Sequence, residues 1–167
     1  MAQYCARFMK DFSTITEPLR KFTKQDTLWQ WSVAEGQAFD TVTSALSKDT
    51  TLAHFDPHKS TEIHVDASPV GPAAILSQEG RPIAYASMSL TDVEQHYSQT
   101  ERDALSVVWA CEHFNVYVHG AHFTVITDHR LLVTIWGKQN PPTRIARWAL
   151  HLTPYAFTVK YKPGIHL

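Results

Sequence analysis

Three carboxylates lie in stretches of the chain where acids are uncommon. Asp66 follows the apolar run Ile63-His64-Val65, Asp128 follows Val125-Ile126-Thr127, and Glu101 stands at the start of a long apolar segment. Burying an unpaired charge is costly, so three acids gathered by a fold would repel one another unless a cation lay between them. Carboxylate oxygens suit a divalent ion such as Mg²⁺. We therefore expect a metal site for phosphodiester chemistry.

Each acid also has a local interpretation that needs no metal. Glu101 occupies the third position of the capping box Ser98-Gln99-Thr100-Glu101, where its side chain would bond the backbone N–H of Ser98. Asp66 and Asp128 could each simply end a strand, and Asp128 could cap the helix that follows it. Taken one at a time, the acids leave both interpretations open.

The elements that must position these acids can be read from the periodicity. Alternating apolar residues, bounded by turn residues, predict strands over 61–67, 73–77, 82–86, 123–127 and 156–161. The capping box predicts a helix from Ser98 to about Tyr117, and a short helix is expected over 131–136. Pro141-Pro142 can begin a last helix. We assign its apolar side to Ile145, Trp148, Ala149 and Leu152, and the stripe of the long helix to Ala104, Leu105, Val108, Trp109 and Glu112.

The order β-β-β-α-β-α-α-β predicts an α/β fold with a mixed five-stranded sheet. In such a sheet the first and fourth strands can be neighbours, which would place Asp66 and Asp128 together, with Glu101 approaching from the helix. An N-terminal helical arm precedes the sheet. The capping box Ser32-Val33-Ala34-Glu35 opens its helix over about 33–47, and Phe8, Phe12, Ile15 and Leu19 predict a shorter element interrupted by Pro18.

Composition sets limits on the class of protein. The 167 residues fit one domain with an extra arm. We expect an intracellular protein, cytoplasmic or nuclear, because no signal peptide or membrane-length apolar run is present. Cys5 and Cys111 suggest no disulfide framework, and a zinc site at His54 and His58 is disfavoured by the turn between them.

Charge is unevenly distributed along the chain. Residues 1–128 hold nine Lys or Arg against sixteen Asp or Glu, whereas residues 129–167 hold six Lys or Arg and no acid. A basic segment after an acidic body would suit a face that binds a polyanion beside a metal site. Ordinary solvated lysines and arginines explain it equally well.

Seven ordered motifs together resemble a known family, the ribonuclease H domain of gypsy-type LTR retrotransposon Pol polyproteins, preceded by the tail of the reverse transcriptase. The motifs are Val65-Asp66-Ala67-Ser68 with Gly71 and Leu76-Ser77-Gln78; Pro82 to Ser87; Tyr97 to Arg102; Val107-Val108-Trp109-Ala110; Phe123-Thr124-Val125; Thr127-Asp128-His129; and Arg144-Ile145-x-Arg147-Trp148 through Tyr161-Lys162-Pro163-Gly164. In the arm, Tyr4 to Phe8, Asp11-Phe12, Glu17-Pro18-Leu19 and Trp29-x-Trp31 also fit.

The resemblance implies a ribonuclease H-like fold over 53–167 and a thumb- or connection-like tail of the polymerase over 1–52. It implies hydrolysis of the RNA strand of an RNA–DNA hybrid by two Mg²⁺ ions, with Mn²⁺ as a substitute, held by Asp66, Glu101 and Asp128. Asp66 would be shared by both ions. The 2′-hydroxyl would select the RNA strand. Ser68, His129, Arg144 and Arg147 are the implied contacts to nucleic acid.

The partners implied are the hybrid and the polymerase region of a parent polyprotein, with no membrane. The polymerase's own aspartates are absent from this sequence, so no polymerase activity is expected of it.

The family continues past the Pro-Gly turn to a fourth acid. Because this sequence ends at Leu167, we expect the second ion to be weakly held and activity to be low or lost. Where this sequence has Pro72, the family has an apolar residue whose backbone N–H can donate. Proline is tolerated at the start of a strand. The alternative function is a retroelement-derived module that binds nucleic acid or protein without cleavage.

Overall fold

A single mixed sheet organises the computed structural model, which describes residues 6–25, 27–47, 52–136 and 142–163. Its strands are β1 (Thr61–Ala67), β2 (Pro72–Gln78), β3 (Arg81–Ser87), β4 (His122–Thr127) and β5 (Ala156–Tyr161), in the order β3-β2-β1-β4-β5. The first three strands are antiparallel neighbours, and β4 runs parallel to both β1 and β5. The expected α/β fold with five strands is confirmed.

The register between β1 and β4 decides where the two strand-end acids lie. Val65 pairs with Thr127, so the residues that follow, Asp66 and Asp128, leave neighbouring parallel strands at the same end of the sheet. Along β1 the odd-numbered residues are buried and the even-numbered ones are half-buried, as a period of two requires. Asp66 is therefore on the opposite face of β1 from Val65.

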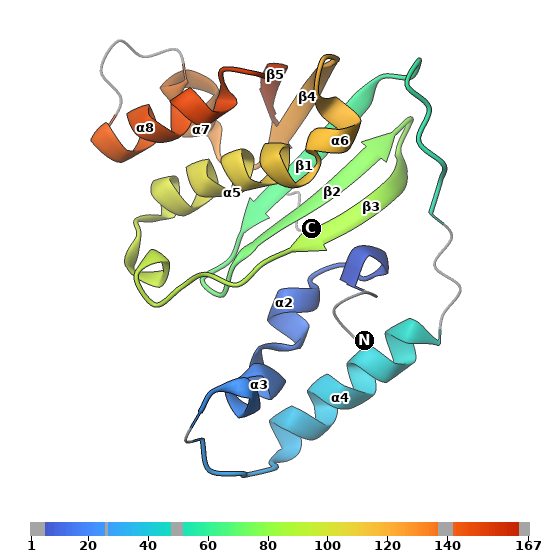
Figure 1. Ribbon diagram of the computed structural model, residues 1–167, viewed down its shortest axis with the longest axis vertical. Helices are drawn as coiled ribbons and strands as arrows, with labels where there is room; N and C mark the ends of the chain where they lie inside the picture. Colours follow the sequence, from blue (N-terminus) through green and yellow to red (C-terminus); the bar gives the residue numbers. More distant parts are fainter. Residues whose placement is uncertain (1–5, 26, 48–51, 137–141, 164–167) are drawn as a thin grey trace.

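Four helices follow the meander: α5 (Gln99–His113), α6 (Asn115–Val118), α7 (Arg130–Ile135) and α8 (Thr143–Leu152). The short 3₁₀ helix η3 (Glu94–His96) precedes α5. Figure 1 shows α5 lying along one face of the sheet with α8 beside it. Between these helices and the sheet is the main core, whose largest buried side chains include Ile63, Leu76, Val107, Phe114, Phe123, Leu132 and Ile145.

The buried stripe of α5 differs from the one predicted. The residues that turn inward are Asp103, Ala104, Ser106, Val107, Val108, Ala110 and Cys111. Leu105 and Trp109 are half-buried and Glu112 is exposed, so the prediction for Glu112 was wrong. The true stripe is rotated around the helix and begins at an acid, Asp103, which is only 3% exposed.

The N-terminal arm packs against the outer edge of β3. It comprises η1 (Ala6–Phe8), α2 (Phe12–Ile15), α3 (Glu17–Arg20), η2 (Lys21–Thr23) and α4 (Val33–Leu46), which lie beyond β3 in Figure 1. Met9, Phe12 and Val42 form a small core of its own. The predicted capping box of Ser32 and Glu35 is confirmed. The backbone N–H of Ser13 donates to Ser87 Oγ at 2.9 Å, which fixes the arm to the sheet.

The turn between β1 and β2, directly after Asp66, leaves no room for a side chain at Gly71. A Cβ added there would lie 1.9 Å from the backbone carbonyl oxygen of Met88 and would clash with it. We expect Gly71→Ala to lower the free energy of unfolding by about 1–3 kcal/mol, the usual cost of overpacking. Urea denaturation followed by circular dichroism measures this change.

The matched control is Gly36→Ala. Gly36 lies inside α4, and the nearest atom to an added Cβ there is 3.8 Å away. Alanine should raise stability at this site by about 0.5–1 kcal/mol, because glycine in a helix loses more backbone freedom on folding. Equal effects of the two substitutions would contradict the tight packing inferred for the β1–β2 turn.

Candidate active site

Asp66 and Asp128 are brought close by the parallel pairing of the strands that carry them. Asp66 is the second-to-last residue of β1 and pairs with Ala73 of β2, and Asp128 is the first residue after β4. Both are half-buried. The sequence prediction that these two acids lie at adjacent strand ends agrees with this placement.

Glu101 lies in the first turn of α5, where it interacts with the helix terminus and with α8. Its Oε2 accepts from the backbone N–H of Ser98 at 3.0 Å and from the Ser98 hydroxyl at 2.9 Å. Its Oε1 is 2.6 Å from a guanidinium nitrogen of Arg144. The bond from the Ser98 backbone is the first cause of a lowered pKa for Glu101. These contacts are those of a helix cap that also binds Arg144.

Asp103, two residues further along α5, is the acid that faces the strand ends. Two positions on a helix are about 200° apart, so Glu101 and Asp103 lie on different faces of α5. Asp103 interacts electrostatically with both Asp66 and Asp128. Its Oδ1 accepts from Gln99 Nε2 at 2.9 Å, and its Oδ2 lies 2.8 Å from His129 Nδ1. The sequence prediction did not include this residue.

The environment of Asp103 changes its proton affinity. Burial is the main reason that the pKa of Asp103 rises from 3.8 to about 6; Asp128 and Asp66 add to the rise, while His129 and Gln99 oppose it. Between pH 4 and pH 6 the unfolded chain has released this proton and the folded chain still holds it. Stability therefore falls as pH rises through this range and stays lower above it.

The substitution Asp103→Asn should remove this loss of stability at higher pH. In EDTA, we expect the variant to be more stable than the wild type at pH 7 by about 2–3 kcal/mol, and the difference to disappear near pH 3.5. Urea denaturation at a series of pH values measures it. Asp40→Asn, at an exposed position on α4, is the matched control and should follow the wild-type curve. A constant difference across the pH series would contradict the raised pKa.

The residues at this end of the sheet have the chemistry that Mg²⁺ requires. Asp66, Asp103 and Asp128 supply only oxygen ligands. Asp103 Oδ2 is buried and, although close to His129, lacks a partner with hydrogen-bond geometry. Within the described ranges, no three His, Cys, Asp or Glu side chains converge closely enough to hold one ion. The donor types fit a magnesium site.

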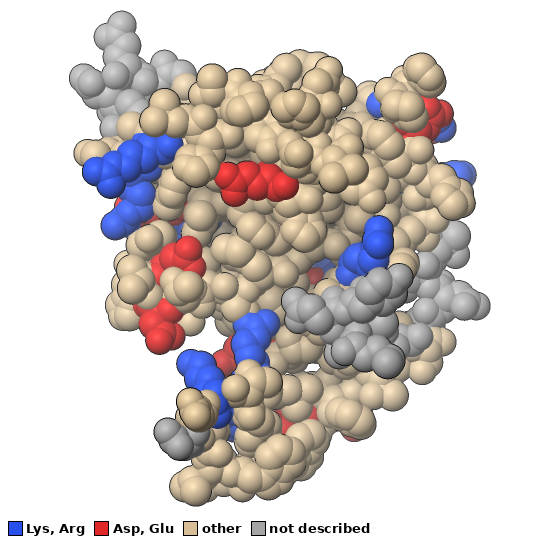
Figure 2. All heavy atoms as spheres, viewed as in Figure 1, with Lys and Arg blue, Asp and Glu red and all other residues tan. Residues whose placement is uncertain are grey.

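The four predicted nucleic-acid contacts have different surroundings. Ser68 Oγ donates to the Gly71 carbonyl at 2.9 Å and accepts from the Gly71 N–H at 3.1 Å, so its hydroxyl closes the β1–β2 turn. His129 contacts Asp103. Arg144 is paired with Glu101 and lies 4.1 Å from the ring centroid of Tyr97. Arg147 is exposed on α8. On the face drawn in Figure 2, Lys and Arg form several separate groups.

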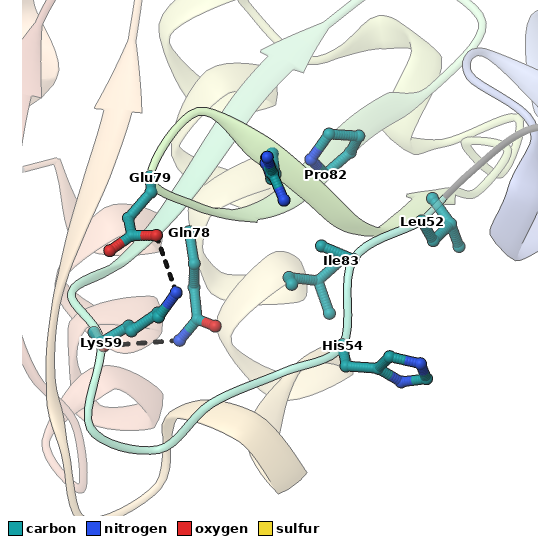
Figure 3. A pocket seen from close by; sticks show the side chains of 9 residues that line it. Leu52, His54, Lys59, Gln78, Glu79, Pro82 and Ile83 are labelled. Carbon is teal, nitrogen blue, oxygen red and sulfur yellow. Dashed lines mark hydrogen bonds and ion pairs between the residues drawn. The ribbon is translucent and has the colours of Figure 1, made fainter.

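A cavity of about 600 Å³ lies at the other end of the sheet. It is bounded by the β2–β3 turn and the segment 52–59 (Figure 3). Gln78, on its wall, pairs with Thr61 at the start of β1, about 17 Å along the strand from Asp66. The amide nitrogen of Gln78 donates to the Asp56 carbonyl at 2.8 Å and to Thr61 Oγ1 at 3.0 Å. This cavity is thus distinct from the acids, and Gln78 serves to hold the segment before β1.

His54 lines the cavity, and His58 is in the turn capped by Asp56. Among the residues described, no group of three His, Cys, Asp or Glu side chains that could hold a metal includes either histidine. None of the helices in the described residues has the length and apolar character that crossing a bilayer requires.

Comparison with known proteins identifies the family of this chain. Residues 56–155 match the model of the RNase H-like domain found in reverse transcriptase. The retrovirus-related Pol polyprotein from transposon 412 of Drosophila melanogaster is 35% identical over 96% of this chain and 13% of its own length. The Tf2-3 transposon polyprotein of Schizosaccharomyces pombe is 30% identical over the same shares. The chain thus spans about an eighth of these curated relatives.

Solved structures share the fold at lower identity. A foamy viral protease–reverse transcriptase in complex with an RNA/DNA hybrid superposes with a TM-score of 0.76 at 21% identity, over 98% of this chain and 24% of that one. The LC11 RNase H1 in complex with an RNA/DNA hybrid gives 0.53 at 14% identity, over 63% and 86%. By the family model and by its relatives, this chain belongs to the RNase H-like domains found in the reverse transcriptases of retrotransposon Pol polyproteins.

Proposed function

We propose that this chain hydrolyses the RNA strand of an RNA–DNA hybrid, with Asp66, Asp103 and Asp128 as its acidic site. The observation that carries the proposal is that three acids from three elements lie near the same end of the sheet. Asp66 ends β1, Asp128 follows the neighbouring strand β4, and Asp103 turns inward from α5. The proposal replaces Glu101 by Asp103, because Glu101 interacts with Ser98 and Arg144.

Each residue has a separate task in this proposal. Asp66 and Asp128 are fixed by strand register, so their carboxylates have positions set by the backbone. Asp103 accepts a hydrogen bond from Gln99 at Oδ1, and its Oδ2 lies 2.8 Å from His129 Nδ1. When bound by these acids, Mg²⁺ would act as a Lewis acid on the phosphate and lower the pKa of an attacking water. Two ions are proposed, as the family resemblance implies, with Mn²⁺ as a substitute.

Substrate choice follows from the chemistry of the strand to be cut. The 2′-hydroxyl distinguishes RNA from DNA at a given site. Arg147, exposed on α8, is proposed to contact a phosphate, since its guanidinium can bind phosphate with two hydrogen bonds. The polymerase region of a parent polyprotein is the proposed partner. In the relatives, the segment that matches this chain is a small part of a longer polyprotein.

The test is cleavage of four end-labelled nucleic acids of the same sequence. The RNA is presented in a hybrid with DNA, in double-stranded RNA and as a single strand, and a labelled DNA duplex serves as the fourth. We expect cleavage of the hybrid alone, with Mg²⁺ or Mn²⁺ and not with EDTA. A hybrid left intact in both metals over a wide concentration range would overturn the proposal.

A second candidate is a module that binds hybrid without cutting it. The observation in its favour is that the three acids do not converge on one point in the described residues. In this case the labelled hybrid would be retained in a filter-binding or fluorescence assay, with an affinity that falls as salt rises. It would stay intact with either metal.

A further inference from the structure

We propose that Gln99 is a positioning residue for the acidic site, which holds the carboxylate of Asp103 against the end of strand β1. This inference rests on the proposed function and adds a residue to it. Gln99 is the first residue of α5 and stands between the helix and the strand that carries Asp66. It lies outside the set of acids and contacts one of them directly.

The side-chain amide of Gln99 makes three contacts, one through each of its hydrogen-bonding groups. Its Nε2 donates to the carbonyl oxygen of Ala67 at 3.2 Å and to Asp103 Oδ1 at 2.9 Å. Its Oε1 accepts from a guanidinium nitrogen of Arg102 at 2.7 Å. A primary amide has two N–H donors and one carbonyl acceptor. All of its groups are therefore used.

The two donor contacts join the segments that carry the acids. Ala67 is the residue after Asp66, so the bond to its carbonyl ties Gln99 to β1 beside the first acid. His129, the residue after Asp128, contacts the other carboxylate oxygen of Asp103 through its Nδ1. A chain of contacts thus runs from β1 through Gln99 and Asp103 to the end of β4. Each acid-bearing segment is linked to the next.

The type of residue at position 99 matters because few side chains can make these contacts. Methionine has nearly the same length and no N–H. Asparagine keeps the amide on a side chain shorter by one methylene and would not span the helix and the strand together. Either change leaves Asp103 Oδ1 without its donor, while each carboxylate oxygen retains lone pairs for an ion. The expected loss is therefore in the placement of the carboxylate.

The experiment compares the wild type with Gln99→Met and Gln99→Asn. Mg²⁺ is titrated into each protein without substrate and followed by calorimetry, and the melting temperature is measured in EDTA. Loss of a residue that orients a metal ligand typically costs about 10–100-fold in metal affinity. We expect a loss of this size in both variants and little change in melting temperature, since position 99 is exposed. Cleavage should recover toward the wild-type rate as Mg²⁺ is raised.

Gln37→Met is the matched control, because Gln37 is an exposed glutamine on α4, in the arm. It should bind Mg²⁺ as the wild type does. Wild-type Mg²⁺ affinity in both Gln99 variants would overturn the inference, even if the hybrid is cleaved. If the Gln99 variants lose Mg²⁺ affinity and no protein cleaves the hybrid, the positioning role stands and the proposed activity falls. A wild type that binds no Mg²⁺ overturns both.

Discussion

Replacing Asp66 by Asn is expected to lower the rate of hybrid cleavage by about a thousandfold or more. A bound divalent ion contributes several kcal/mol to transition-state stabilisation, and each 1.36 kcal/mol is worth about a factor of ten. Asp66 is the acid whose position is most firmly set, because β1 is paired with β2 on one side and β4 on the other. Asn keeps the size of the side chain and removes the charge that binds the ion.

The measurement is the single-turnover rate of cleavage of a labelled hybrid at saturating protein. Asp40→Asn, the same change at an exposed position of α4, should cleave at the wild-type rate. Binding of the hybrid in EDTA is measured beside the rate, so that a loss of chemistry is separated from a loss of substrate. Unchanged cleavage by the Asp66 variant would exclude this end of the sheet as the active site.

The second large effect separates two acids that are two residues apart. Asp103→Asn should reduce cleavage by about a hundredfold or more, the scale seen when one preorganised group is removed from an active site. Glu101→Gln should change it by less than about threefold. Its amide can still accept from Ser98, and what it loses is a partly exposed ion pair with Arg144, worth about 0.2–1 kcal/mol of stability.

Both variants are assayed at several Mg²⁺ concentrations, and their unfolding in urea is measured in EDTA. The two variants should differ in both activity and stability. Asp103→Asn is expected to lose activity and gain stability, whereas Glu101→Gln is expected to keep activity and lose a little stability. The reverse pattern of activities would restore Glu101 to the site and exclude Asp103.

Most of the sheet could be predicted from the sequence because each strand carries its own signal. Alternating burial in β1 and tight turns around β2 are local properties, and the two capping boxes at Ser32 and Ser98 are confirmed. The parallel neighbours β1 and β4 followed from the rules for crossovers. The positions of Asp66 and Asp128 at strand ends were predictable for the same reason.

The error at α5 arose from the phase of its stripe. A helix with apolar residues at 104, 105, 107 and 108 has two plausible inward faces, which lie about 200° apart around the helix axis. The face through Leu105, Val108 and Glu112 includes position 101, whereas Glu101 was placed in the predicted site because it opens the long apolar helix and lies in a family motif. The face that is buried includes Val107 and Ala110 and continues back to Asp103. Only packing against the sheet decides between them, and the clue in the sequence was an acid aligned with Val107 and Ala110.

The pairing of β1 with β4 makes the chain unequally tolerant of changes in length. Inserting one codon directly after Thr61 in β1 would move every later side chain of that strand to the other face of the sheet. Asp66 would then point toward the core while Val65 and its neighbours faced water. The same insertion between α7 and α8 would leave both strand-end acids in place. A collection of naturally occurring copies should therefore show length differences in loops and a constant residue count between Thr61 and Asp66.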